Sequence, residues 1–278
     1  MSGREIMFRV GRAARIHYQR WHLYYPPREA TRVDESMVRW LPAAPCVTPE
    51  PYIRVADEIV AGKLRIFVRD SDDYGEGRDW NRDPISGRVA PLAYAKTLDY
   101  RDSSTVGDIK YVWEPNRHLH FVPLAQAFNI TGDKRYLATL EEHVDTWINQ
   151  SPYPRGVNWV SGLELGIRLI NWSIAWHLVT ESGDFSVNVR DRWLASIYRH
   201  CKHIENYFSR YSSANNHLIG EAAGLFVATC TWPLWPETQR WQARSQAILE
   251  DEIKKQIGRD GVGLEQAISY QQFILDFL

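Results

Sequence analysis

Apolar and polar positions follow a helical period over most of the chain from Glu114 onward. In the stretch 162–180, apolar residues recur every three or four positions, which is the spacing of one helix face. Pro115 suits the first position of a helix that runs to Asn129, and Gly132 suits its end. The pattern therefore predicts helices in steady succession, joined by short loops as in antiparallel helix pairs.

The same periodicity predicts further helices along the rest of the chain. They cover 134–149, with Asp133 as its cap, and then 162–180, 189–211, 217–231, 237–257 and 264–278. The helix 162–180 is apolar on more than one side, which is typical of an inner helix in a layered arrangement. Alternating inner and outer helices predict a mainly α fold, namely an incomplete (α/α) toroid of antiparallel helix pairs. The sequence shows no repeat of fixed period, which disfavours a solenoid.

Residues 1–108 differ from the rest, because they are irregular and rich in proline. We expect one amphipathic helix over 4–24 and short β strands around 58–68 in this segment. We therefore divide the chain into an N-terminal segment, 1–108, packed on the toroid, and an α/α toroid domain, 109–278. The last residues stop inside an apolar helical pattern, from which we expect the sequence to be cut from a longer chain.

Charge and aromatic content narrow the function classes. The 33 basic residues nearly cancel the 34 acidic ones, which argues against nucleic acid and anionic membranes as partners. The 12 Trp, 14 Tyr and 9 Phe suit thick helical cores, and their flat rings also suit sugar rings. Because a densely sulfated polymer usually meets a basic cleft, the near-neutral charge makes such a substrate less favoured, although a local patch can hide in a neutral total.

The number and spacing of the cysteines, together with the N-terminal residues, indicate the cellular compartment of the protein. Cys46, Cys201 and Cys230 are odd in number and far apart, unlike a disulfide framework. No stretch is long and apolar enough to span a membrane, and the Arg-rich start lacks the features of a secretory signal. We therefore expect the cytoplasm by default, with the periplasm left open.

The decapeptide SSANNHLIGE, residues 212–221, raises the question of function. Asn216 and His217 stand just before an apolar helical run. One interpretation is an ordinary helix start with Asn216 as its cap. The other is that the amide and the imidazole face a substrate.

Longer segments around this decapeptide carry a family resemblance. In chain order they are KYVWEPNRHLHFVPLAQAFNITGDKRYL, NWVSGLELGIRLINW, SANNHLIGEAAGLFVA and GRDGVGLEQAISYQQF. Together they resemble the N-terminal domain of the heparinase II/III-like polysaccharide lyases, over roughly 79–278, and SGREIMFRVGRAAR resembles that family's opening helix. The resemblance implies an incomplete α/α toroid followed by a β-sandwich, which this sequence lacks. It also implies eliminative cleavage of an acidic, uronic-acid-containing polysaccharide, and we expect no metal or other cofactor.

The resemblance places parts of the family's active centre on this sequence. The Asn of an Asn-His pair falls on Asn216, with His217 beside it, and the catalytic Tyr falls on Tyr270. A further His, and in some branches a second Tyr, come from the β-sandwich in the family. We therefore expect the 278-residue chain to be inactive, or nearly so, on its own.

These residue types suit β-elimination, which removes the C5 proton of a uronic acid and expels the 4-linked oxygen. Charge that develops on the carboxylate needs hydrogen-bond donors, each worth about 3–4 kcal/mol when well placed. Asn216 and His217 at a helix N-terminus suit that task. A Tyr such as Tyr270 can act as base and return a proton to the leaving oxygen. Arg117 is our candidate for clamping the substrate carboxylate, because its fork suits bidentate pairing.

Structural interpretations compete at each position. Tyr270 could be a core aromatic, and Arg117 with Glu114 could form a surface pair on one helix. Trp113 and Trp159 could stack on sugars or pack in the core. Glu164 and Arg168 lie four apart on an apolar helix, so we expect them to pair with each other or to line the cleft.

Other catalytic and metal-binding signals are weak. His200, Cys201 and His203 resemble half a metal site, but no second cluster matches them. His118 and His120 point to different sides of the expected helix. No glycine-rich phosphate loop follows a strand, and the serine-hydrolase pattern GxSxG is absent.

Two rival functions stay open beside the lyase. A glycoside hydrolase on an α/α toroid would need two carboxylates across a cleft, chosen from Glu114, Glu164, Glu221, Asp260 and Glu265. A non-catalytic glycan-binding module of an exopolysaccharide system would keep its role after Tyr270→Phe. A lyase leaves an unsaturated uronate that absorbs in the ultraviolet, whereas a hydrolase leaves none.

Overall fold

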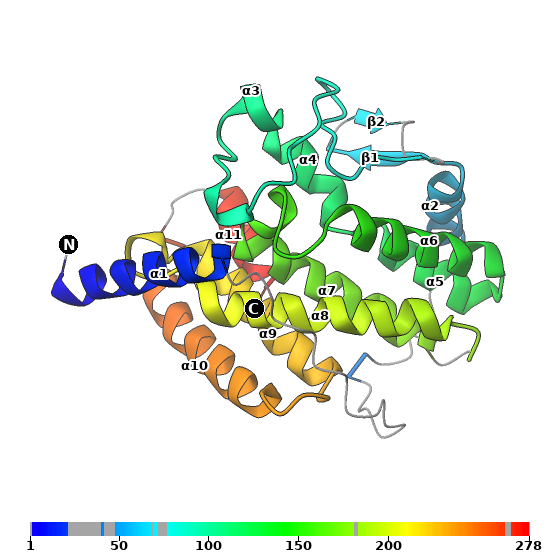
Figure 1. The fold of residues 1–278 in the computed structure, drawn as a ribbon. Helices are drawn as coiled ribbons and strands as arrows, with labels where there is room; N and C mark the ends of the chain where they lie inside the picture. The colour runs from blue at the N-terminus through cyan, green and yellow to red at the C-terminus, as the bar shows by residue number, and fades with distance from the viewer. Residues whose placement is uncertain are drawn as a thin grey trace.

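The computed structural model describes residues 2–21, 40–41, 48–67, 69–71, 77–180, 183–264 and 268–277. The described chain is mainly helical, with long helices packed in layers and one small sheet at the edge (Figure 1). None of the described helices is both long and apolar enough to cross a membrane.

An inner row and an outer row of helices form the body. The inner helices are α5 (Phe121–Thr131), α7 (Gly162–Val179) and α9 (Asn216–Thr231). The outer helices are α6 (Lys134–Gln150), α8 (Val187–Tyr207) and α10 (Thr238–Gln256). The fully or largely buried residues of α7 and α9 lie all around each helix, as expected of inner helices.

The inner helices run parallel to one another. At one end, the guanidinium of Arg117, just before α5, bonds to Glu164 in the first turn of α7. At the other end, Asn129 near the end of α5 donates to the carbonyl of Leu178 at 3.1 Å. Helices α7 and α9 also run in the same direction. The ring of Trp176, near the C-terminal end of α7, lies 5.7 Å from the ring of Trp232, directly after α9.

The outer helices run against the inner ones. Trp147, near the end of α6, donates to Asn116, which precedes α5, at 2.7 Å. Gln256 at the end of α10 donates to the carbonyl of Asn215 at the start of α9, at 3.1 Å. Parallel inner helices with antiparallel outer partners are the arrangement expected of part of an α/α toroid.

A glycine contact sets how closely α7 and α9 approach. A Cβ placed on Gly166 would lie 2.3 Å from the carbonyl oxygen of Gly220, and one on Gly224 would lie 2.3 Å from the Cα of Gly166. Real side chains do not tolerate such distances, so the two backbones meet here without side chains between them. This contact fixes the relative height of the two helices.

The remaining elements surround this body. They are α1 (Gly3–Trp21), α2 (Glu50–Val60), β1 (Leu64–Ile66), β2 (Arg69–Ser71), α3 (Ser103–Val106), α4 (Ile109–Asn116) and α11 (Ile268–Leu275), with 3₁₀ turns at Ala95–Thr97, Val157–Trp159 and Tyr211–Ser213. The strands β1 and β2 pair antiparallel, with Arg65 opposite Asp70. Helix α2 packs on α5 and α6, and α11 packs on α9.

Most helices expected from the sequence are present, with ends shifted by a few residues. Asp133 caps α6 and Gly132 ends α5 in the left-handed conformation, as predicted. The helix expected over 115–129 is wrong, because α4 ends at Asn116 and the chain breaks at His118 (φ 59) before α5 begins. Both His118 and His120, which lie in this break, are buried in the core.

Two expectations in the first hundred residues need similar correction. The β strands expected around 58–68 shrink to β1, since 58–60 belong to α2, and residue 68 lies outside the described residues. Helix α1 begins near the expected position, but residues 22–24 also lie outside the described part.

Aromatic rings and histidines fill the centre of the body. Trp147, Trp172 and Trp193 are buried to 1% exposure or less. The ring of His118 stacks on Phe121 at 4.3 Å, and its Nδ1 accepts a hydrogen bond from Trp172 at 2.8 Å. The buried histidines of this core are His118, His120, His143, His200 and His203, and burial lowers the pKa of each.

Candidate active site

The chemistry expected from the sequence gathers at the end of the body where the inner helices begin. Arg117 precedes α5, Glu164 lies in the first turn of α7, and Asn216 opens α9. Because the inner helices are parallel, their N-terminal ends, which carry the positive ends of the helix dipoles, face the same way. This end therefore suits an anionic group.

The start of α9 is built from neighbouring asparagines. The side chain of Asn215 accepts a hydrogen bond from the backbone N–H of His217 at 3.1 Å, so Asn215 is the cap. The interpretation of Asn216 as the cap is therefore wrong, and Asn216 is the first residue of the helix. Asn216 is 5% exposed, and His217 is half-buried. The cap of α9 is therefore Asn215, and Asn216 takes no part in capping.

Glu221 lies one helical turn after His217 and is buried to 1% exposure. Its carboxylate accepts hydrogen bonds from the backbone N–H of Ser209 at 2.6 Å and from the Ser209 hydroxyl at 2.8 Å. A Cβ on Gly162 would lie 2.6 Å from Glu221 Oε1, so the start of α7 closes over this carboxylate. Burial raises the pKa of Glu221 to about 7, against the lowering effect of the Ser209 hydrogen bonds.

Lys96, on the 3₁₀ turn Ala95–Thr97, stands close to the same carboxylate. Its ammonium donates to the carbonyl of Val160 at 2.8 Å and lies 4.6 Å from the centre of the Tyr207 ring. Burial lowers the pKa of Lys96 to about 7, and the charge of Glu221 opposes that shift. The sequence analysis missed Lys96, because a single lysine in an irregular segment carries no spacing signal.

Arg117 forms a closed ion network. Its guanidinium makes paired hydrogen bonds to both oxygens of Glu164, at 2.9 and 3.0 Å, and a third bond to Glu114 at 2.9 Å. Although burial opposes the charge, the two carboxylates outweigh it and raise the pKa of Arg117 above its ordinary value. Burial raises the pKa of Glu114, and the nearby Glu164 adds to that effect. A guanidinium held by two carboxylates is already neutralised, so this geometry does not favour Arg117 as a clamp for a further anion.

Of the two roles expected for Glu164 and Arg168, pairing with each other is not observed, because Glu164 bonds to Arg117 instead. Arg168 is fully buried and donates to the carbonyl of Asn116 at 3.0 Å and to His200 Nε2 at 3.1 Å. Burial lowers its pKa to about 9. Arg168 therefore joins segments of the core, and its burial argues against direct contact with a substrate.

The two candidate sugar-stacking tryptophans differ in exposure. Trp159 is 1% exposed and donates to the carbonyl of Ser151 at 2.9 Å, so burial closes both faces of its ring. Trp113 is half-buried, donates to the carbonyl of Val157 at 3.1 Å and has Tyr100 at 5.3 Å. The structure leaves part of the Trp113 ring accessible but not that of Trp159.

Tyr270 lies on α11, which packs against α9, and its side chain is 49% exposed. Its neighbour Gln271 donates to the carbonyl of Gly261 at 3.0 Å, which ties the start of α11 to the loop after α10. The end of α10 in turn contacts Asn215. These contacts join the start of α11 to the loop after α10, and the end of α10 to the residue before α9, while Tyr270 remains open to solvent.

The described carboxylates do not form the open pair that a glycosidase needs. Glu164 and Glu221 are 2% and 1% exposed, and Glu114 and Glu164 share Arg117. Asp260 is exposed in a turn, where it accepts from the backbone of Val262, and Glu265 lies outside the described residues. Nothing in this arrangement favours the hydrolase over the lyase.

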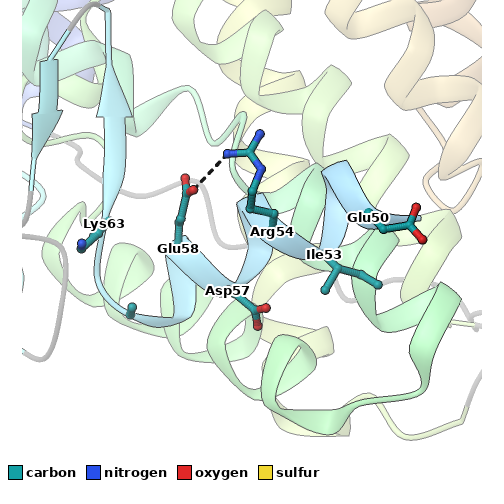
Figure 2. Close-up of a pocket in the computed structure, with 7 residues that line it drawn as sticks. Glu50, Ile53, Arg54, Asp57, Glu58 and Lys63 are labelled. Carbon is teal, nitrogen blue, oxygen red and sulfur yellow. Dashed lines mark hydrogen bonds and ion pairs between the residues drawn. The ribbon is translucent and has the colours of Figure 1, made fainter. Parts of the chain in front are cut away.

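A surface hollow on α2 lies elsewhere. It is lined by Glu50, Ile53, Arg54, Asp57, Glu58, Ala61 and Lys63 (Figure 2). Arg54 and Glu58 form an exposed ion pair at 3.1 Å within it. Asp57 accepts from the hydroxyl of Tyr136 near the start of α6, which is the opposite end of that helix from Trp147 and the candidate site. The hollow therefore belongs to a different part of the molecule.

Histidine and cysteine side chains do not add a metal centre to this picture. In the described part of the chain, no group of three or more His, Cys, Asp or Glu comes together as a metal site. His118 and His120 do not point to different sides of a helix, because their rings lie 5.7 Å apart in the core.

Together these features define a class: a mainly helical domain whose parallel inner helices begin at one end, with Asn216 and His217 in the first turn of α9. Comparison with known families gives the particular family. Residues 54–278 match the heparinase II/III N-terminus, and the chain belongs to that family. The match begins earlier than residue 79, where the resemblance in the sequence was expected to start.

Curated relatives and solved structures agree with this assignment. The chain is 26% identical over 188 residues to a heparin-sulfate lyase of Bacteroides stercoris, covering 60% of this chain and 28% of the relative. It is 27% identical over 165 residues to a heparin-sulfate lyase of Bacteroides thetaiotaomicron, covering 58% and 23%. The matched region thus spans less than a third of these relatives' length.

The fold is similar to that of crystallised enzymes of this kind. Heparan sulfate lyase HepC from Pedobacter heparinus superposes with a TM-score of 0.63 at 19% identity, over 96% of this chain and 38% of that one. A structure of heparinase III gives a TM-score of 0.57 at 19% identity, over 98% and 39%. At this level of identity the similarity establishes the mainly helical fold.

Proposed function

We propose that the protein is a polysaccharide lyase that cleaves a uronic-acid-containing glycosaminoglycan by β-elimination, with this chain supplying the helical domain. The observation that carries the proposal is the first turn of α9, where Asn215 is the cap and Asn216 and His217 are the first two residues of the helix. The names of the relatives, heparin-sulfate lyases, support heparan sulfate as the first substrate to try.

The proposed roles follow from the positions of the groups. Asn216 and His217 donate hydrogen bonds to the uronate carboxylate as charge develops on it, helped by the N-terminal dipole of α9. Tyr270, exposed on α11, takes the C5 proton and returns one to the leaving oxygen. Further groups come from a second domain in the full-length protein, as the family resemblance implies, so its β-sandwich is the proposed partner of this end. The division of the chain into an N-terminal segment, 1–108, and an α/α toroid domain, 109–278, is also part of this proposal.

The Arg117 network has a different role in this proposal. Because Glu114 and Glu164 occupy its guanidinium, it holds the starts of α5 and α7 together and shapes the floor beneath the site. Trp113 remains a candidate for contact with a sugar, whereas the burial of Trp159 and Arg168 leaves them out.

The test uses full-length protein and a panel of heparan sulfate, hyaluronan and alginate. A lyase produces an unsaturated uronate, which is followed by its ultraviolet absorbance. Asn216→Ala is expected to lower kcat about 10²–10³-fold, the usual cost of one oxyanion donor. Tyr270→Phe is expected to abolish turnover, while Arg54→Gln on α2 serves as a control that changes nothing. Glycan cleavage without new ultraviolet absorbance would refute elimination.

A further inference from the structure

An arginine cluster lies outside the candidate active site, where α1, the end of α8, the following connection and α10 meet. It consists of Arg12, Arg15, Arg210, Arg240 and Arg244. Figure 1 shows α1 projecting along the same side of the molecule as the α8–α9 connection and α10. The whole chain carries a formal charge of −1, so this concentration of positive charge is local.

Contacts place Arg12, Arg15 and Arg244 around the end of α8, and Arg210 follows that end three residues along the chain. Arg15 donates to both the carbonyl and the side-chain oxygen of Asn206, each at 3.0 Å. Arg244 donates to the carbonyl of Glu205 at 3.3 Å and lies 5.0 Å from the Phe208 ring. Arg12 lies 5.9 Å from the Tyr207 ring. These direct partners are uncharged groups, and the carboxylates of Glu205 and Glu221 act on Arg244 and Arg12 without an ion pair to either.

The arginines also act on one another. Burial lowers the pKa of Arg244, and the charges of Arg210, Arg15 and Arg240 lower it further. Glu205 supplies a carboxylate, but Arg240 at 2.7 Å and Lys202 at 2.9 Å already share it. A surface on which like charges oppose each other is stabilised when an anion binds.

The exposure of the cluster makes it accessible to a polymer. Arg15 is exposed, Arg240 keeps 62% of its side chain exposed, and the other members are half-buried. Guanidinium forks suit oxyanions with two or more oxygens, such as sulfate groups. Arg210 stands on the connection that leads to Asn215 and Asn216, so a chain bound here can continue toward the start of α9.

We propose that the arginine cluster binds sulfate groups of an acidic polysaccharide, beside the site where the polymer is cleaved. The cluster then selects sulfated polymers over polymers that carry carboxylates alone. The inference rests on the proposed function only in treating the bound polymer as a substrate, because binding itself is measurable without cleavage.

The test measures binding of full-length protein to immobilised heparan sulfate and to unsulfated hyaluronan across a salt series. Arg210→Gln/Arg244→Gln is compared with Arg54→Gln/Arg65→Gln, which removes the same charge from exposed positions on α2 and β1. The first pair is expected to weaken heparan sulfate binding about tenfold or more and to reduce the slope of log Kd against log salt by about two. The control pair, and hyaluronan binding by either variant, are expected to change less than about twofold. Thermal melts confirm that all variants fold.

The outcomes separate this inference from the lyase proposal. Three results would refute the cluster as a sulfate-binding surface. The control pair could lose as much affinity for heparan sulfate as the cluster pair, or the cluster pair could lose as much affinity for hyaluronan as for heparan sulfate. The third is that the parent protein does not bind heparan sulfate at low salt. If the cluster variant loses binding but the parent protein cleaves no glycan, the lyase proposal fails and the binding surface stands. If the parent protein cleaves a glycan and the cluster variant binds heparan sulfate as the parent does, the binding surface is refuted and the lyase proposal stands.

Discussion

Glu221 holds Ser209 by two hydrogen bonds, at 2.6 Å from the backbone N–H and 2.8 Å from the hydroxyl. Ser209 begins the connection that ends at Asn215, the cap of α9, and Glu221 sits on α9 itself. The connection is therefore fastened back onto the helix that it introduces. This geometry fixes the segment that presents Asn216 and His217.

Replacing Glu221 should change how stability depends on pH. Burial raises the folded-state pKa of Glu221 to about 7 from the ordinary 4.5, so the folded protein holds a proton that the unfolded chain releases between these values. Its contribution is complete below pH 4.5 and is lost as pH rises through 7, by up to about 1.4 kcal/mol per unit. Glu221→Gln lacks this loss. Denaturant unfolding should show it gaining on the parent protein between pH 5 and 7.

The matched variant Ser209→Ala separates the proton from the tether. It removes the hydroxyl bond and keeps the titrating carboxylate, so its stability difference from the parent protein should be about 1 kcal/mol and nearly independent of pH in this window. A stability difference between Glu221→Gln and the parent protein that stays flat from pH 5 to 7 would contradict the buried-proton account.

The buried histidines should make the protein sensitive to acid. Burial lowers the pKa of His120 to about 3, and those of His118, His143, His200 and His203 move in the same direction. Their contribution is present above the unfolded value near 6.5 and is lost as pH falls below it, because only the unfolded chain takes up the protons. Each such histidine adds about 1.4 kcal/mol of stability per pH unit between roughly pH 5 and 6.5.

Single variants show which histidines cause this dependence of the unfolding free energy on pH. His143→Gln removes one buried imidazole, whose Nδ1 lies 3.1 Å from Nε2 of His120. It should reduce the slope of the unfolding free energy against pH by the contribution of one proton, about 1.4 kcal/mol per pH unit. Gln246→Ala, on the exposed side of α10, removes no titratable group and should leave the slope unchanged. Chemical denaturation at several pH values measures both, and an identical slope in the His143 variant and the parent protein would sink the idea.

The contact between α7 and α9 should not accept a methyl group. Gly166→Ala puts a Cβ 2.3 Å from the Gly220 carbonyl oxygen, which forces the helices apart and should cost about 3 kcal/mol or prevent folding. Gly11→Ala on α1 is the matched control, because no atom lies within 4 Å of its new Cβ. It should be neutral or stabilising by up to about 1 kcal/mol, since alanine favours a helix. Thermal and denaturant melts of the two variants distinguish these outcomes.

The Arg117 network should behave as a coupled structural unit. Arg117→Met leaves Glu164, 2% exposed, without its paired bonds and should destabilise by about 3 kcal/mol. In Arg117→Met/Glu164→Met the buried charge of Glu164 is removed together with its partner, while Glu114 lacks Arg117 as it does in the single variant, so the loss should be smaller than the sum of the single losses. A clamp for the substrate would instead raise KM in Arg117→Met with stability intact. Measuring unfolding and steady-state kinetics on the same variants decides between these roles.

Several local features of this protein were predictable from the sequence, because they depend on neighbours along the chain. The helical period, the cap at Asp133 and the stop at Gly132 each involve a few successive residues. The decapeptide with Asn216 and His217 marked the start of α9 for the same reason. The helical pattern also predicted the mainly α fold class, and the family resemblance agreed with it and directed attention to Tyr270.

Tertiary structure alone decided which of these residues meet, and in what surroundings. A helical period shows which face is apolar but not which helix that face will contact, so Arg117 paired with Glu164, 47 residues away, rather than Glu164 with Arg168. Burial depends on all the layers packed around a side chain, which is why Trp159 lies in the core and Glu221 holds a raised pKa. The arginine cluster brings together residues of α1, α8 and α10, which are far apart in the sequence. The sequence does not reveal it, because acidic residues elsewhere bring the net charge of the chain to −1.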